Sequence, residues 1–404
     1  DRREGTLSYG SISADGAIVP MDNGSYFNFY LSDSRAPSFY KADLTRIRFI
    51  PKDKNAREIH IFNYSAHPEV FRLNCWSKSG VGLLTADYVA YLCARDKELT
   101  GADSIVFSGA IGGLVAIRGY ECDANGNYVY LEKLYIPFAQ ELFKRGITDK
   151  AGLIESTKSL YIEYYSEEEW NALTDAEKEE MSYYFAPDIE PDIWDEWCVA
   201  YYQQHDKYAR ELTVKVGNWL AEQSLLIANE KPLAVSLNVA AAQTDIPVEN
   251  KVFKLASFGG IMAGKGHLDF ADGKMRILNR TEVACINLGG LKIALVPGEI
   301  FPELAYNGCC QAAQINPDKQ NPETLSGIAK DDSLLVFGLA NDEIGYIVTP
   351  ERFLLDEKLP YIQAGVETGN YSRHYEETMS MGPDTAYYIA DAFKKAVNAL
   401  DTAQ

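Results

Sequence analysis

The sequence contains few of the patterns that would assign it at once to a common class of protein. Its 404 residues include no apolar run of about 18 residues, so no membrane-spanning helix is expected. No G-x-S-x-G, H-E-x-x-H or G-x-x-x-x-G-K-S/T motif occurs. An ordinary serine-hydrolase elbow, a common metalloprotease helix and a phosphate-binding loop are therefore not indicated. The seven cysteines form no C-x-x-C pair, which argues against a zinc knuckle and a disulfide framework.

Positive charge is also scarce. The chain has 38 Lys and Arg residues against 58 Asp and Glu residues, which gives a formal net charge of -20. Such an acidic surface repels DNA, RNA and anionic lipid headgroups, so we expect no nucleic-acid partner. Tyrosine is abundant, with 26 residues, many of them between Tyr161 and Tyr208. Aromatic side chains of this kind contact lipids or sugars, or simply pack in a core, and both readings stay open.

Short β-branched and apolar runs alternate with helical patterns along the chain. This alternation predicts a mixed α/β fold, with a layered sheet and helices on both of its faces. The predicted strands are 45–50, 58–64, 104–107, 231–240, 274–278, 282–296 and 333–339, and the clearest predicted helices are 83–95 and 302–314.

The segment 120–230 has a different composition, rich in acidic, lysine and aromatic residues. Ser166-Glu-Glu-Glu and Thr174-Asp-Ala-Glu are typical of capped helix starts. We therefore expect residues 120–230 to form a helical insertion, which acts either as a lid over a site or as a structural buttress.

Three polar motifs follow predicted strands. They are N-Y-S-A-H-P at 63–68, V-P-G-E at 296–299 and N-D-E-I-G-Y-I-V-T-P-E at 341–351. Ligands of open α/β sheets bind just beyond the carboxyl ends of the strands. Loops in these positions would let His67, Glu299 and Tyr346 converge.

The order of these motifs resembles the neutral/alkaline, non-lysosomal ceramidase family. T-A-D-Y-V-A-Y at 85–91, Y-E at 375–376 and G-P-D-T at 382–385 add to the resemblance, which covers most of 45–119 and 270–390. The resemblance implies a catalytic zinc ion held by His67, Glu299 and Tyr346, with a further histidine as fourth ligand. It also implies that Asp87 is a positioning acid, and that Gly112 and Gly113 lie on the wall of the site.

Two departures from the family pattern bear on activity. The family's H-T-H-S-G-P segment, which carries the first zinc histidine, does not occur in this sequence, which begins at Asp1. We therefore expect residues 1–404 to form a ceramidase-like domain that lacks its N-terminal part. In addition, Val115 stands where the family has its catalytic serine, and Gly113 replaces the adjacent aspartate.

The resemblance implies a zinc-dependent hydrolase of an amide bond in a ceramide-like N-acyl lipid or small molecule. The alternative is a catalytically silent protein of the same fold that binds a lipid, a glycan or a protein. A secreted or cell-surface location also follows from the resemblance alone. Because of Val115 and the missing histidine, we expect this chain to show little or no ceramide hydrolysis.

Overall fold

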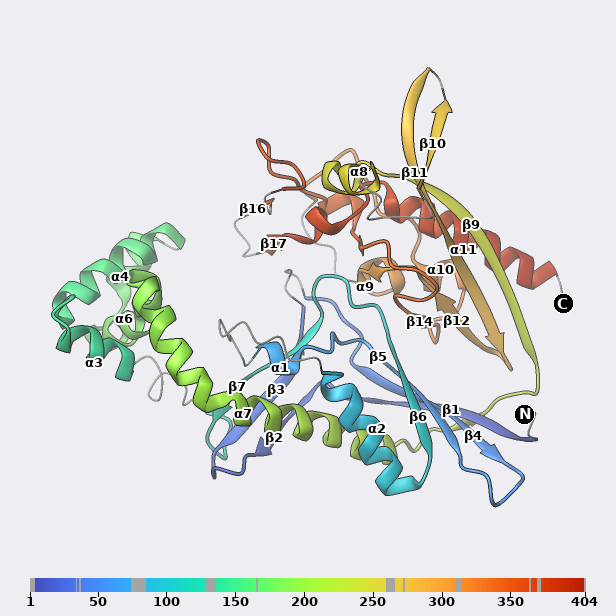
Figure 1. Ribbon diagram of the computed structural model, residues 1–404, viewed down its shortest axis with the longest axis horizontal. Helices are drawn as coiled ribbons and strands as arrows, with labels where there is room; N and C mark the ends of the chain where they lie inside the picture. Colours follow the sequence, from blue (N-terminus) through green and yellow to red (C-terminus); the bar gives the residue numbers. More distant parts are fainter. Residues whose placement is uncertain are drawn as a thin grey trace.

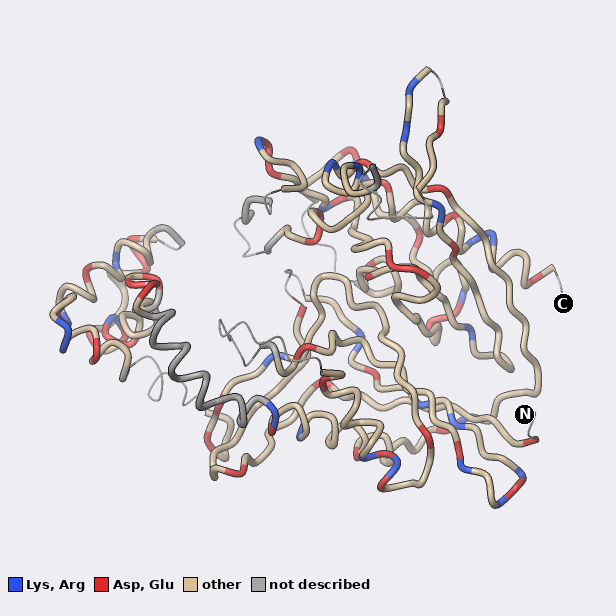
Figure 2. Tube along the Cα trace, viewed as in Figure 1, with Lys and Arg blue, Asp and Glu red and all other residues tan. Residues whose placement is uncertain are grey.

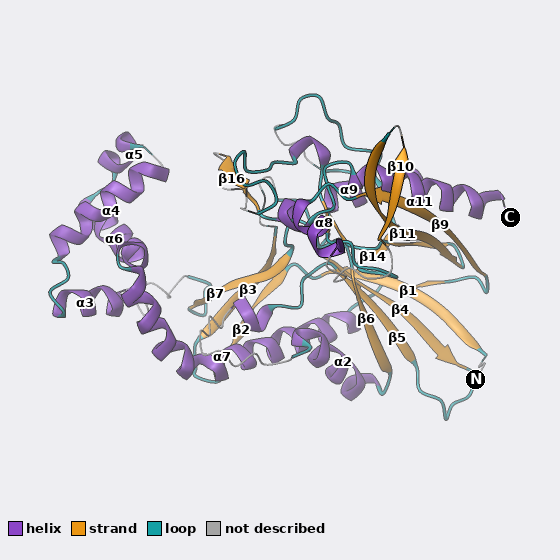
Figure 3. Cartoon of the chain, turned by 45° about the horizontal axis from the view of Figure 1, so that its top comes forward, coloured by secondary structure: helices purple, strands orange, loops and turns teal. Residues whose placement is uncertain are grey.

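The chain forms a mixed α/β structure, which confirms the fold class expected from the sequence. Two five-stranded sheets lie against each other, and each carries helices on its outer face (Figures 1 and 3). The computed structural model describes residues 4–33, 35, 38–73, 85–127, 136–164, 166–258, 266–271, 273–309, 314–362, 365–368 and 372–402.

The first sheet has the strand order β6-β5-β4-β1-β8, with β5 and β6 parallel and the other pairs antiparallel. Side chains alternate between its two faces, as the pleat requires. Ile47 and Ile61 face the second sheet, whereas Leu44 and Phe62 pack under the helices α2 and α7. The elements are β1 (Gly5–Ser13), β4 (Asp43–Pro51), β5 (Ile59–Tyr64), β6 (Asp103–Ser108), β8 (Lys231–Pro232), α2 (Asp87–Thr100) and α7 (Pro191–Leu225).

The second sheet runs β10-β11-β12-β14, and β9 also pairs with the long strand β11. Ile293 faces the first sheet, while Val283 and Ala294 pack under α11. The rings of Phe107 and Phe337 stack 4.3 Å apart between the two sheets. The elements are β9 (Leu237–Pro247), β10 (Gly266–Ala271), β11 (Lys274–Leu288), β12 (Leu291–Leu295), β14 (Leu335–Phe337) and α11 (Thr385–Thr402).

The prediction of one strand over 282–296 is wrong, because the chain turns back at Gly289-Gly290. Leu288 pairs with Leu291, so the loop of this hairpin has two residues. Both glycines have positive φ, 61° and 104°, a conformation that a tight two-residue hairpin turn requires and glycine adopts readily.

Helices occupy most of the chain between β7 (Ala116–Cys122) and β8. The capping boxes predicted at Ser166 and Thr174 are confirmed, each with its reciprocal glutamate. In Figures 1 and 3, α3 to α6 stand apart from the sheets, joined to them by α7.

No helix in the described part of the chain is both long and apolar enough to cross a bilayer. The elements are α3 (Ile136–Lys144), α4 (Lys150–Tyr164), α5 (Glu167–Ala172) and α6 (Asp175–Ile189). The limits 120–230 for a separate insertion stay a prediction.

Candidate functional site

The candidate site lies where loops leave β5, β12 and β14. His67 follows β5 by three residues, Glu299 begins the short strand β13 (Glu299–Ile300), and Tyr346 begins β15 (Tyr346–Ile347). The strands β13 and β15 pair in parallel, and Glu299 and Tyr346 are direct partners in their register. The fold thus brings together three residues that are far apart in sequence.

Two glycines allow this close pairing. A Cβ atom at Gly298 would lie 2.5 Å from the carbonyl oxygen of Gly345, so only glycine lets the two loops approach this closely. Gly345 has a φ of 85°, and a Cβ atom there would collide with the carbonyl oxygen of Met379. The backbone N–H of Glu299 then donates to the carbonyl of Gly345 at 3.2 Å.

The imidazole of His67 is fixed at both nitrogens. Its Nδ1 lies 2.9 Å from the carbonyl oxygen of Val115, which also accepts the backbone N–H of His67 at 2.9 Å. Because a carbonyl only accepts, Nδ1 carries a proton, and Nε2 is directed at the Glu299 carboxylate, 2.7 Å away. Burial alone would lower the pKa of His67, but the hydrogen bond and charge of Glu299 outweigh burial and raise it.

Tyr346 is the third predicted residue, and its hydroxyl lies 2.8 Å from that of Tyr375. Burial, together with the charge of Glu299, raises the pKa of Tyr346 far above its ordinary value, so the phenol is neutral as it stands. Burial also raises the pKa of Tyr375. A phenolate at Tyr346 would therefore need a nearby cation to stabilise it.

Two carboxylates that the sequence analysis did not single out lie near this group. Partial burial and the charge of Glu299 raise the pKa of Glu343 to about 7. The charge of Glu69 acts on both His67 and Tyr375. Its Oε1 is buried and has no hydrogen-bond partner among the described residues. Glu343 lies within the third strand-end motif and Glu69 directly follows the first, but neither has a metal-specific spacing that would have marked it.

The other predicted site residues have structural contacts. The Asp87 carboxylate accepts the backbone N–H groups of Val70 and Phe71 at 3.0 and 2.9 Å, and so caps α1 (Val70–Leu73), which follows the His67 loop. Gly112 donates its N–H to Ile300 at 2.9 Å. A Cβ atom at Gly113, whose φ is 73°, would lie 2.7 Å from Asp33.

Val115 contributes its backbone to the site, because its carbonyl holds His67. Its side chain is fully buried in the core beneath α2 and α7. The sequence resemblance aligns Val115 with the family serine, and a valine side chain is not a nucleophile.

The ligand atoms that His67, Glu299 and Tyr346 offer are of types that bind zinc. An imidazole nitrogen, a carboxylate and a phenol oxygen are all capable zinc ligands, and an Nδ1–H bonded to a carbonyl is the usual support for a ligating Nε2. Within the described ranges, however, no cluster of three or more His, Cys, Asp or Glu side chains is arranged to hold a metal ion. A zinc ion bound by His67 and Glu299 would therefore need Tyr346 as a third ligand.

A buried ionic network lies behind the Glu299 strand. The Arg35 guanidinium donates to both Glu376 and Glu377 at 2.8 Å and lies 4.7 Å over the ring of Phe301, two residues after Glu299. Arg35 and the two glutamates are all buried. Burial opposes ionisation of Glu377, yet the hydrogen bond of His374 and the charge of Arg35 hold the pKa of its carboxyl below the usual range.

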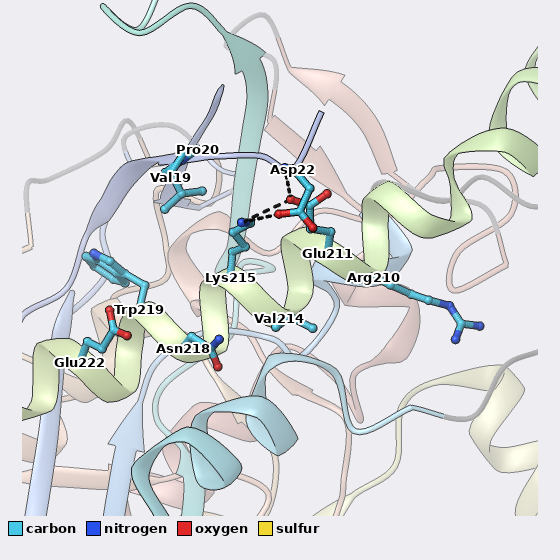
Figure 4. Close-up of a pocket in the computed structure, with 10 residues that line it drawn as sticks. All are labelled: Val19, Pro20, Asp22, Arg210, Glu211, Val214, Lys215, Asn218, Trp219 and Glu222. Atoms are coloured by element: carbon cyan, nitrogen blue, oxygen red, sulfur yellow. Dashed lines mark hydrogen bonds and ion pairs between the residues drawn. The ribbon is translucent and has the colours of Figure 1, made fainter. Parts of the chain in front are cut away.

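A separate groove of about 600 Å³ runs between α7 and β2 (Gly16–Pro20) and contains none of the predicted site residues (Figure 4). Lys215 in this groove pairs with Asp22 and Glu211 at 3.1 and 3.4 Å. Lys215, Asp22 and Glu211 thus satisfy one another, and the groove is not the candidate site.

The fold and the strand-end residues define a mixed α/β protein with a polar site of histidine, glutamate and tyrosine. No protein-family model and no curated protein matches the sequence. Among solved structures, the chain is similar to the neutral ceramidase from Pseudomonas aeruginosa, with 10% identity, a TM-score of 0.47, and coverage of 99% of this chain and 53% of that one. It is also similar to a ceramidase complexed with C2, with 10% identity, a TM-score of 0.45, and coverage of 99% and 54%. The chain spans about half the length of these structures.

Proposed function

We propose that this protein is a hydrolase of an amide bond in a ceramide-like N-acyl lipid, with zinc held by His67, Glu299 and Tyr346. The observation that carries the proposal is the fixed orientation of His67. Its Nδ1 donates to the Val115 carbonyl, so Nε2 is directed toward Glu299, which is the register partner of Tyr346.

Each residue has a distinct role in this proposal. His67 and Glu299 would bind the ion through Nε2 and a carboxylate oxygen, and Tyr346 would bind it as a phenolate. The Tyr375 hydroxyl, 2.8 Å from that of Tyr346, would donate a hydrogen bond to the phenolate and lessen the penalty of ionising it. When bound, zinc would polarise the acyl carbonyl and lower the pKa of water toward about 7.

The alternative is a catalytically silent protein of the same fold that binds a lipid, a glycan or a protein. The buried Val115 side chain favours this alternative, because it removes the serine route. Only three ligands are proposed among the described residues, and an incomplete set holds zinc weakly.

The two functions differ in the turnover of a fluorescent ceramide with added zinc. We expect slow turnover at most, abolished by a chelator and by Glu299→Gln, and not accelerated by Val115→Ser. The matched control is Glu357→Gln, which removes an exposed carboxylate and should change nothing. Rapid turnover that survives both the chelator and Glu299→Gln would contradict the proposal. Zinc binding at the site without any turnover would favour the silent protein.

A further inference from the structure

The hairpin of β10 and β11 projects from the body of the protein (Figure 1). Phe270 pairs with Met275 and Leu268 with Ile277 across its two strands, so these side chains share one face. Phe270 is 72% exposed, Met275 57% and Leu268 50%. β9 joins β11 only from Leu278 onward, so no third described strand covers this part of the hairpin. Exposed apolar side chains that share one face are typical of a surface that binds a partner or a membrane.

A second apolar surface lies at the same end of the molecule. The helix α8 (Lys251–Phe258) lies beside the base of the hairpin in both views (Figures 1 and 3). It exposes Val252 and Leu255, which are three residues apart and so lie on one side of the helix. The hairpin and α8 together form what we call the apolar end.

Basic residues accompany these apolar side chains, although the protein as a whole is acidic. The segments 251–258 and 266–279 contain four basic residues, Lys251, Lys254, Lys274 and Arg276, against two acidic residues, Asp269 and Asp272. Figure 2 shows the basic positions on both α8 and the hairpin. An apolar surface with basic residues around it is complementary to an anionic lipid surface.

The apolar end also adjoins the candidate site. Phe253 of α8 lies 3.7 Å from where a Cβ atom of Gly345 would be, and Gly345 precedes Tyr346. Asn250, just before α8, donates to the carbonyls of Thr378 and Ser380, on either side of the half-exposed Met379. The apolar end is thus tied to the same loops that position the site.

We infer that the apolar end docks on an anionic lipid bilayer, with the β10–β11 hairpin and α8 inserted at its surface. This inference rests on the proposed function, since it supplies a lipid substrate directly at the site. Insertion would bury Phe270, Met275 and Leu255, while the basic residues contact the headgroups.

The test is flotation of the full chain with phosphatidylcholine vesicles, with and without phosphatidylserine, in the absence of any substrate. We expect binding that is stronger with phosphatidylserine, and at least about tenfold weaker in the double variant Phe270→Ser and Met275→Ser. Lys251→Glu and Lys274→Glu should each weaken binding to the anionic vesicles by about fivefold or more. Leu226→Ser is the control, because Leu226 is 62% exposed but lies after the end of α7.

Equal vesicle binding by the wild type and the double variant would overturn the inference. So would lipid-independent self-association, measured by sedimentation, that the same double variant abolishes, because the apolar end would then bind a second copy of the chain. Hydrolysis of a water-soluble short-chain N-acyl amide, measured separately, reports on the proposed function alone, and the double variant should leave it unchanged.

Discussion

Replacing Arg35 with methionine is expected to lower the free energy of unfolding by about 3–5 kcal/mol. Glu376 and Glu377 are fully buried, and Arg35 donates to both of them. Removing the guanidinium would leave two carboxylates in a low-dielectric interior without their cation, and methionine replaces its volume but not its charge. Denaturant unfolding followed by circular dichroism measures the loss.

The control for Arg35→Met is Arg95→Met. Arg95 also contacts two glutamates, Glu98 and Glu222, but on the surface of the protein, where solvent screens the pairs. A small effect at both positions would show that the buried network contributes little. A large effect at Arg35 alone would establish that the network stabilises the region behind the Glu299 strand.

The second large effect concerns metal affinity. Glu299→Ala is expected to weaken zinc binding by more than about 100-fold, because loss of even an outer partner of a ligand weakens it by about 10–100-fold. Competition against a chelator in isothermal titration calorimetry measures this change. Glu343→Gln is the nearby control, since the Glu343 carboxylate accepts the N–H of Gly345 and is not one of the proposed ligands. If both variants bind zinc equally well, Glu299 is not a ligand.

The sequence predicted those features that depend on local patterns. β5 and β6 match the predicted strands 58–64 and 104–107 closely, because their apolar runs end at turn residues. The helix starts at Ser166 and Thr174 were predictable, since a capping box needs only four residues. The Gly289-Gly290 turn was also present in the sequence as a hairpin signal, and the long apolar run around it concealed it.

Features that depend on distant residues could not be predicted in this way. The predicted helix 302–314 is helical only at α9 (Pro302–Ala305), and residues 310–313 lie outside the described part of the chain. Arg35 reaches its glutamates across more than 340 residues, so no local pattern links them. The role of Val115 could not be predicted for a different reason. Its backbone carbonyl accepts the hydrogen bond from His67 Nδ1, and a residue of any type could supply that carbonyl.

The most direct test of the account is to locate zinc in crystals of this protein by anomalous diffraction on both sides of the zinc absorption edge. The account predicts one peak about 2.0–2.2 Å from His67 Nε2 and from a Glu299 oxygen, with the Tyr346 hydroxyl as the third ligand. The present 2.7 Å hydrogen bond between His67 and Glu299 would then be replaced by bonds to the ion. A crystal saturated with zinc in which that hydrogen bond persists and no peak lies beside it would contradict the account.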